Sequence, residues 1–198
     1  MDQIYILALL WIVWCCLHSL AISRFFIRNM KSRLGTGFCY YRIAYNGFSL
    51  LTLIPIVIYQ LRLPEKILFA WTGFWIIPRI GMYLISFVLF VGGYRAYDIG
   101  YVLGLKQAKE ARNRSGCESM DFNTTGILRY VRHPWYSGAI ILIWAFGPIS
   151  AASLVTKIIL TGYIIVGTFL EEKKLIHMIG EPYLRYRGEV PMLIPWKK

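Results

Sequence analysis

The chain has 198 residues, of which 57% are hydrophobic, and a mean hydropathy of +0.52. A composition this apolar excludes a soluble domain of this length and predicts an integral membrane protein. The formal net charge is +12, but the basic residues lie between apolar runs and not in one continuous patch. This distribution favours anchoring at a membrane surface over nucleic-acid binding.

The cysteines have no Cys-x-x-Cys spacing, and two of them are adjacent within an apolar run: Cys15, Cys16, Cys39 and Cys117. This arrangement indicates neither a zinc site nor a disulfide framework. Reduced, structural cysteines and no bound metal are therefore expected.

The first apolar run, residues 4–22, contains no charged residue and is long enough to cross a bilayer as a helix. It lacks a basic leading region and an evident small-residue cleavage site, so a retained helix is predicted in place of a cleaved signal peptide. His18 lies within this run. Such a histidine either faces a ligand site or, more often, finds a backbone or water partner near a helix end.

The middle of the chain alternates basic and apolar stretches. Residues 23–42 carry basic side chains and no acidic one, which is typical of a cytoplasmic loop. A second span follows over residues 43–61, with a kink expected at Pro55. The next connection is weakly charged and is placed outside. A third span is predicted over residues 75–94, and the polar stretch 95–132 is placed in the cytoplasm.

Residues 136–148 form a fourth apolar run that is only about half as long as a bilayer is thick and ends at a Gly-Pro turn. Residues 153–170 supply a returning fifth helix. We therefore predict an all-α integral membrane protein with five transmembrane helices, the last two forming a helical hairpin, in a single domain over residues 1–198. Its N-terminus would lie outside, and its C-terminus and polar site in the cytoplasm.

A candidate ligand site lies at residues 126–138, GILRYVRHPWYSG. Pro134 removes a helical hydrogen bond and biases His133 away from helical geometry, so a turned segment should present polar groups at the membrane face. The unpaired N–H groups of the helix that starts near Tyr136 point back at this segment, where a carboxylate or purine acceptor could use them. An ordinary loop with an aromatic interface anchor is the alternative.

An acid pair, Glu171 and Glu172, follows the predicted fifth span. Acids at a helix C-terminus are electrostatically unfavourable, so a cationic partner is expected. That partner is either an adjacent lysine, a cationic ligand group or an arginine such as Arg129 or Arg132. The hairpin should bring the acid pair to the face that carries Arg132. Further on, Tyr183, Tyr186 and Arg187 are spaced as one face of a short helix that is either a lid or interface packing.

These stretches carry a family resemblance. In order and spacing, RHPWYSG, the acid pair and GEPYLRYRGEVPMLIP are similar to the C-terminal half of the isoprenylcysteine carboxyl methyltransferase family and its phospholipid methyltransferase relatives. The resemblance implies an integral membrane enzyme with a cytoplasmic cofactor-binding region over residues 113–138 and 171–195. It would bind S-adenosylmethionine, release S-adenosylhomocysteine, and methylate a lipophilic acceptor that enters from the bilayer.

The resemblance also implies roles for individual residues. Glu171 would face the cationic or amino end of the cofactor, and Glu172 would support it. Backbone and side chains of one segment would line the nucleoside, namely His133, Pro134, Trp135 and Tyr136. A less well matched segment would close the other wall, namely Met120, Asp121, Phe122, Asn123 and Leu128. No catalytic residue is implied.

The acceptor stays open at this point. The chain is most like protein-S-isoprenylcysteine O-methyltransferases, but a phospholipid amine is an alternative, which would need its proton removed by His133, the acid pair or solvent. Membrane sterol reductases, which bind NADPH, also carry an Arg-His-Pro-x-Tyr-x-Gly segment before a hairpin. The acid pair suits a sulfonium or ammonium better than the extra phosphate of NADPH. A non-catalytic accessory protein would leave both polar clusters without a purpose. We expect a monomer surrounded by membrane lipids, without nucleic acid.

Overall fold

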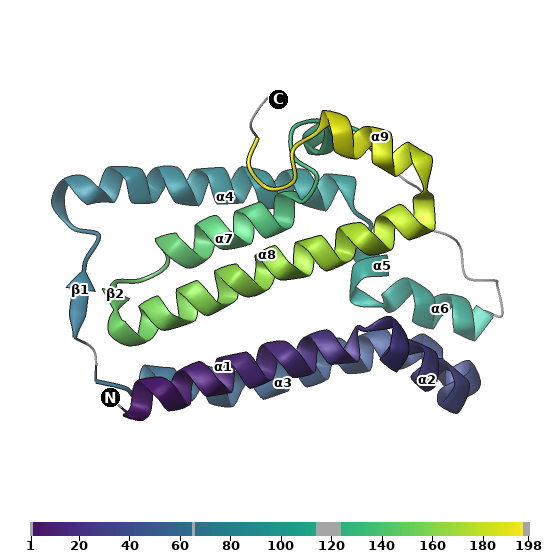
Figure 1. Ribbon diagram of the computed structural model, residues 1–198, viewed down its shortest axis with the longest axis horizontal. Helices are drawn as coiled ribbons and strands as arrows, with labels where there is room; N and C mark the ends of the chain where they lie inside the picture. The colour runs from purple at the N-terminus through teal and green to yellow at the C-terminus, as the bar shows by residue number, and fades with distance from the viewer. Residues whose placement is uncertain (1, 65, 114–123, 196–198) are drawn as a thin grey trace. The chain divides into compact units, whose positions relative to one another are not determined.

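The computed structural model describes residues 2–64, 66–113 and 124–195 (Figure 1). The chain divides into two compact units. The first unit comprises Met1–Pro64 and Asp98–Met120, and the second comprises Glu65–Tyr97 and Asp121–Lys198.

The first unit is built on two long helices, α1 (Asp2–Ala21) and α3 (Tyr41–Leu61), which pack against each other. The buried residues of α1 are Leu7, Trp11 and Cys15, which recur every four positions and so lie on one stripe of the helix. The rest of α1 is largely exposed, as expected for a surface that faces lipid. The first two predicted spans are therefore found close to their predicted boundaries.

The segment between α1 and α3, which was predicted as a loop, is helical. Helix α2 (Arg24–Leu34) begins after Ser23, whose hydroxyl accepts the backbone N–H of Phe26 at 3.2 Å. The 3₁₀ helix η1 (Gly35–Tyr40) then leads into α3. Two short helices from the later polar stretch, α5 (Ile99–Leu103) and α6 (Leu105–Asn113), complete this unit.

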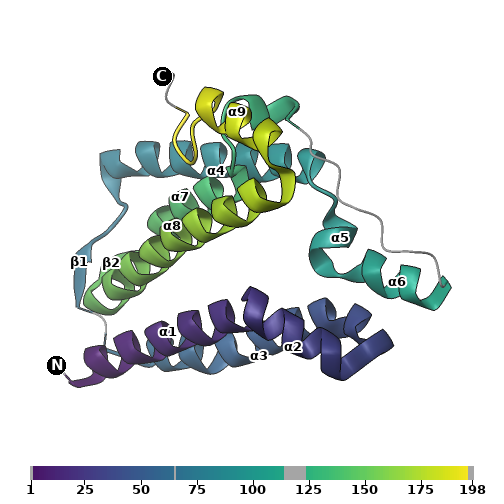
Figure 2. The same cartoon turned by 45° about the vertical axis from the view of Figure 1, so that its right-hand side comes forward.

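The second unit contains the helices α4 (Ile76–Ala96), α7 (Pro134–Ala145), α8 (Ala151–Ile179) and α9 (Glu181–Glu189), and the 3₁₀ helices η2 (Gly73–Trp75) and η3 (Gly126–Arg129). Helix α7 packs against both α4 and α8 (Figures 1 and 2). Strands β1 (Ile67–Phe69) and β2 (Ile149–Ser150) pair antiparallel. This pairing places the segment before α4 and the α7–α8 connection at the same end of the unit.

Glycines allow α7 and α4 to approach closely. A Cβ atom added at Gly93 would lie 2.3 Å from Cδ1 of Trp135, which is far inside van der Waals contact. The indole N–H of Trp135 donates to the Phe90 carbonyl at 3.1 Å and so holds the first turn of α7 against α4. Gly93 therefore sets how closely the segment that carries the candidate site can pack.

We expect Gly93→Ala to lower the free energy of unfolding by about 1–3 kcal/mol, because the added methyl group overpacks the contact with Trp135. Gly81→Ala in the same helix is the matched control, since a Cβ atom there meets nothing within 4 Å. Heat-induced unfolding in detergent measures both. Equal stability of the two variants would contradict this account of the α4–α7 contact.

The prediction of five spanning helices is not confirmed. Among the described residues, four segments are long and apolar enough to cross a membrane, namely Asp2–Ala21, Arg24–Leu61, Gly73–Ala96 and Ala151–Ile179. Helix α7 has only 12 residues, about 18 Å, against a hydrocarbon core of about 30 Å. It ends early because Gly147 has φ +64° and Pro148 follows it. The predicted hairpin of α7 and α8 is present, but α7 is only a little more than half as long as the hydrocarbon core is thick.

Cationic side chains satisfy the carbonyl groups at the C-terminal end of α7. Arg79 Nε and the Tyr83 hydroxyl each donate to the Ala145 carbonyl at 3.1 Å. Lys157 is only 4% exposed. Its Nζ donates to the Phe146 carbonyl at 2.8 Å and also to the Ile143 carbonyl. Arg79 and Lys157 are thus held by the carbonyls that the end of α7 leaves unpaired.

Helix α8 is longer than predicted. It has 29 residues and begins with a capping box formed by Ser150 and Ser153. It ends where Gly180 adopts φ +74°. Glu171 and Glu172 consequently lie two turns before the helix end, so the expected conflict with the helix dipole does not arise. The helix dipole is therefore not the reason that Glu171 and Glu172 have partners.

Candidate functional site

The centre of the candidate site is an ion pair between Arg132 and Glu172. Arg132 Nε and Nη2 lie 2.6 and 2.5 Å from Glu172 Oε1. Arg132 is 7% exposed and Glu172 is 3% exposed. The predicted meeting of the two polar stretches is thus confirmed, and it is Arg132 that supplies the cation.

Glu172 also gathers side chains from two other elements. His133 Nε2 lies 3.3 Å from Oε1, and the Tyr183 hydroxyl of α9 donates to the same oxygen at 3.4 Å. Arg187 Nε, also from α9, lies 3.4 Å from Oε2. One buried carboxylate therefore ties together α8, the start of α7 and α9.

The C-terminal segment is bonded along the start of α7 (Figure 2). The backbone N–H groups of Arg132 and His133 donate to the carbonyls of Pro191 and Met192 at 3.0 and 3.2 Å. The Ser137 hydroxyl donates to the Leu193 carbonyl at 2.6 Å. These bonds hold the RHPWYSG segment in its turned geometry, so the predicted role of Pro134 in shaping a turn is shared with the tail.

A small apolar core lies beneath this arrangement, formed by Leu128, Tyr183, Tyr186 and Val190. The Tyr186 hydroxyl donates to the Leu128 carbonyl at 2.6 Å, and burial raises the pKa of Tyr186 to about 12. The two tyrosines of α9 are therefore interface packing and not a lid. Leu128 belongs to this core.

Glu171 has a separate partner from Glu172. The Tyr136 hydroxyl donates to Glu171 Oε2 at 2.5 Å. The Tyr136 ring stacks on His133, with centroids 5.6 Å apart. Both acids thus contact the RHPWYSG segment, one through the arginine and one through the tyrosine.

Burial lowers the pKa of His133 below its ordinary value of 6.5; Arg132 lowers it further, and the negative charges of Glu171 and Glu172 oppose the shift. The ring is therefore neutral at neutral pH. The nitrogen that faces Glu172 is Nε2, so a hydrogen there satisfies the carboxylate.

This shift predicts a pH dependence of stability. In the folded chain His133 binds its proton more weakly than in the unfolded chain, so the free energy of unfolding should fall as the pH is lowered through 6.5 and level off below the folded-state pKa. His133→Gln should remove this contribution. Unfolding midpoints of both proteins between about pH 8 and pH 5 measure it. Identical pH profiles would show that His133 does not titrate differently on folding.

An open cavity of about 330 Å³ lies beside Glu172. Two arginines, Arg132 and Arg187, border it together with Glu172, and its apolar walls include Phe169, Val190 and Met192. Arg187 lies within the predicted cofactor-binding region over residues 171–195 but was not predicted individually, and Phe169 was not predicted at all. Arg187 lies within the GEPYLRYRGEVPMLIP motif, which was the available signal, whereas nothing local marks Phe169.

The predicted site residues fall into three groups. Glu172 borders the cavity, while His133 and Pro134 are buried beside it and Trp135 and Tyr136 are half-buried. Leu128 packs in the tyrosine core. The predicted second wall, Met120, Asp121, Phe122 and Asn123, lies outside the described residues.

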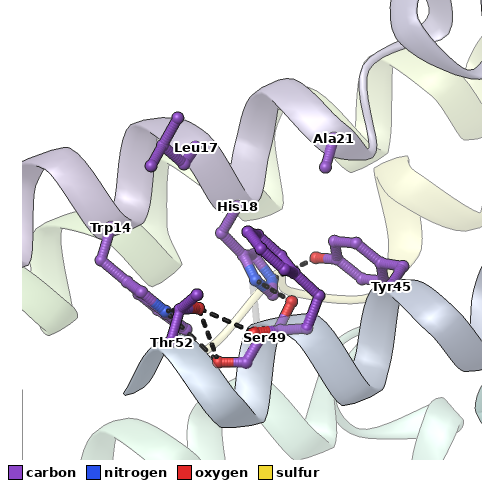
Figure 3. A pocket seen from close by; sticks show the side chains of 8 residues that line it. Trp14, Leu17, His18, Ala21, Tyr45, Ser49 and Thr52 are labelled. Atoms are coloured by element: carbon purple, nitrogen blue, oxygen red, sulfur yellow. Dashed lines mark hydrogen bonds between the residues drawn. The ribbon is translucent and has the colours of Figure 1, made fainter. Parts of the chain in front are cut away.

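A second polar cluster lies between α1 and α3 of the first unit (Figure 3). His18 Nδ1 lies 3.1 Å from the Ser49 hydroxyl, and His18 Nε2 lies 2.5 Å from the Tyr45 hydroxyl. Trp14 stacks on the imidazole with ring centroids 4.9 Å apart. His18 therefore has hydrogen-bonding partners near a helix end. This was the more common of the two alternatives for His18, although its partners are side chains and not the backbone or water.

Together these features define a helical membrane protein with a buried, ion-paired site that joins two segments distant in the sequence. A family described as NnrU protein matches residues 6–174, which is most of the chain. The chain belongs to this NnrU family.

Several curated proteins are similar to this chain, and those described here are named methanethiol S-methyltransferase. The protein from a Pseudomonas species is 36% identical over 126 residues, covering 63% of this chain and 43% of that protein. The protein from Mycobacterium tuberculosis is 31% identical over 143 residues, covering 72% and 55%. A protein from Bradyrhizobium diazoefficiens is 42% identical over 77 residues, covering 39% and 27%.

The chain thus spans about half the length, or less, of these relatives. No solved structure matches the chain. The resemblance to membrane methyltransferases is confirmed by these relatives, whose names do not include an isoprenylcysteine acceptor.

Proposed function

We propose that the protein is an integral membrane methyltransferase that uses S-adenosylmethionine. The observation that carries this proposal is the cluster in which Glu172 joins Arg132, His133 and Arg187 beside a cavity. The cluster is built from the same two segments whose order and spacing resemble membrane methyltransferases. The relatives named above support methyl transfer, and they do not favour a reductase or a phospholipid amine methyltransferase.

The cavity has a size and polarity suited to part of such a cofactor. Its volume of about 330 Å³ falls within the range of about 300–1,000 Å³ that is usual for small-molecule sites. Its border combines a carboxylate for a cationic group with guanidinium groups for an anionic one. When bound, S-adenosylmethionine supplies an electrophilic methyl group on a sulfonium.

The geometry favours an exchange of the roles expected for the two acids. Glu172 borders the cavity and we place the cationic end of the cofactor beside it, whereas Glu171 is bonded to Tyr136 and acts as support. Trp135 and Tyr136 are half-buried and are proposed to contact the nucleoside. His133 and Pro134 would shape the site from beneath. The wall over residues 120–123 stays part of the proposal.

We propose a thiol as the acceptor, because the relatives are named for methanethiol. A thiol acceptor would first lose its proton to solvent. The thiolate sulfur would then form a bond to the methyl carbon as the bond from that carbon to the sulfonium sulfur breaks, which leaves dimethyl sulfide and S-adenosylhomocysteine. The protein has to align the reactants and exclude water. A small apolar thiol also dissolves in a bilayer and can enter from it. A monomer with an outside N-terminus and a cytoplasmic site remains part of the proposal.

The test supplies methyl-labelled S-adenosylmethionine to the purified full-length protein with one of three acceptors, namely methanethiol, an S-prenylated cysteine or phosphatidylethanolamine. We expect the label in dimethyl sulfide. Label in the prenylated cysteine or the phospholipid would replace the proposed acceptor. Absence of transfer to every acceptor, together with no binding of S-adenosylhomocysteine, would overturn the methyltransferase proposal.

A further inference from the structure

The cavity is bordered by one more positive than negative side chain. Arg132 and Arg187 are both cationic, and Glu172 is the carboxylate between them. Arg132 is buried, and its guanidinium donates to Glu172 Oε1, to the Arg187 carbonyl at 3.0 Å and to the Val190 carbonyl. Its charge and hydrogen bonds are therefore used within the protein, and Arg187 is the surplus cation.

Arg187 is placed to bind a ligand. Its side chain is 47% exposed, and its ion pair with Glu172 is long, with Nε 3.4 Å from Oε2. An exposed guanidinium with so long a contact has donors to offer a planar anion such as a carboxylate. The side chain borders the cavity, so an anion bound there would enter with the ligand.

The two oxygens of Glu172 are unequally used. Oε1 accepts from Arg132, His133 and Tyr183, whereas the contact of Oε2 within the described part of the chain is the long one to Arg187. A carboxylate oxygen has room for more than one donor. Oε2 can therefore accept from a ligand ammonium while Arg187 binds an anion beside it.

We propose that Arg187 and Glu172 Oε2 together bind the α-amino acid end of the ligand, with the carboxylate on Arg187 and the ammonium on Glu172. This inference rests on the proposed function, under which the group is the methionyl end of S-adenosylmethionine. The apolar walls at Phe169, Val190 and Met192 suit the carbon chain between that group and the sulfur. The arrangement assigns the cavity to the amino acid end and the half-buried aromatic residues to the nucleoside.

The test compares two ligands that share a nucleoside and a thioether. S-adenosylhomocysteine carries the amino acid end, and 5′-methylthioadenosine lacks it. Their dissociation constants are measured on the full chain in detergent for the wild type and for Arg187→Gln. We expect Arg187→Gln to weaken S-adenosylhomocysteine about tenfold, the lower end of what a charge-assisted hydrogen bond contributes, and to leave 5′-methylthioadenosine unchanged.

Arg185→Gln is the matched control, because Arg185 is an exposed arginine on the same helix and does not border the cavity. It should change neither dissociation constant, and Arg187→Lys should recover part of the loss because it keeps the charge. Unfolding temperatures of all variants exclude a general loss of folding.

Two results would overturn the inference while leaving the proposed function intact. One is an equal effect of Arg187→Gln on both ligands, or no effect on either. The other is equal affinity of the wild type for the two ligands, which would mean that the amino acid end contributes nothing. A wild-type protein that binds neither ligand would instead overturn the proposed function, and the inference with it.

Discussion

Glu172→Gln should lower the free energy of unfolding by about 3–5 kcal/mol, because it leaves the guanidinium of Arg132 buried without its counter-charge. Arg132 and Glu172 are 7% and 3% exposed, so water in the cavity beside them replaces only part of the lost interaction. The change also replaces the charged oxygen that Tyr183 and His133 share with a neutral amide oxygen, which is a weaker acceptor. Denaturant-induced unfolding of the full chain in detergent measures the loss.

Glu171→Gln is the control for this experiment. Glu171 is half-buried and bonded to the Tyr136 hydroxyl, so its loss should cost only about 1 kcal/mol. A double variant, Arg132→Met with Glu172→Leu, should recover much of the stability, since no unpaired charge remains. Equal losses for Glu171→Gln and Glu172→Gln would contradict the assignment of Glu172 as the centre of the cluster.

Lys157→Met should also be strongly destabilising, by about 2–5 kcal/mol, because the carbonyls of Ile143 and Phe146 would lose a charged donor within an apolar segment. The variant should also bind S-adenosylhomocysteine less tightly, because α7 carries the candidate site at its other end and a loosened helix would position that site less well. Heat-induced unfolding and ligand titration measure the two effects.

The matched control for Lys157→Met is Lys173→Met, an exposed lysine on the same helix, which should change stability by less than about 0.5 kcal/mol. Lys157→Arg should be milder than Lys157→Met, since a donor remains. If Lys157→Met were as stable as the control, the end of α7 would have to be satisfied in another way.

Hydropathy was sufficient to find the apolar helices, but not where they end. The predicted end of the fifth span at residue 170 was set by the charges of Glu171 and Glu172, yet α8 continues to Ile179. Glutamate and lysine are good helix formers, so charge marks the edge of the apolar segment and not the end of the helix. The start of α8 at Ala151 lies within two residues of the predicted start at residue 153, and Ser150 caps it.

The early end of α7 was predicted, because the apolar run stops at the local Gly147-Pro148 turn. The donors to its last carbonyls were not predicted, since Arg79 and Lys157 come from α4 and α8. Those contacts are tertiary, so no local pattern reveals them. For the same reason, the acid pair gave candidate partners but not their assignment, because adjacent residues of a helix point about 100° apart. Which of them faces Arg132 is fixed only by packing.

The bonds between the start of α7 and the C-terminal segment also bear on how the protein is made. The Pro191, Met192 and Leu193 carbonyls hold Arg132, His133 and Ser137, and these two segments are separated by the rest of α7 and by all of α8 and α9. A growing chain can insert its apolar helices in order of synthesis, but it cannot complete this site until residues 191–193 have been translated. A nascent chain that has already inserted α8 therefore still carries a polar surface on Arg132 and Glu172 that awaits the tail.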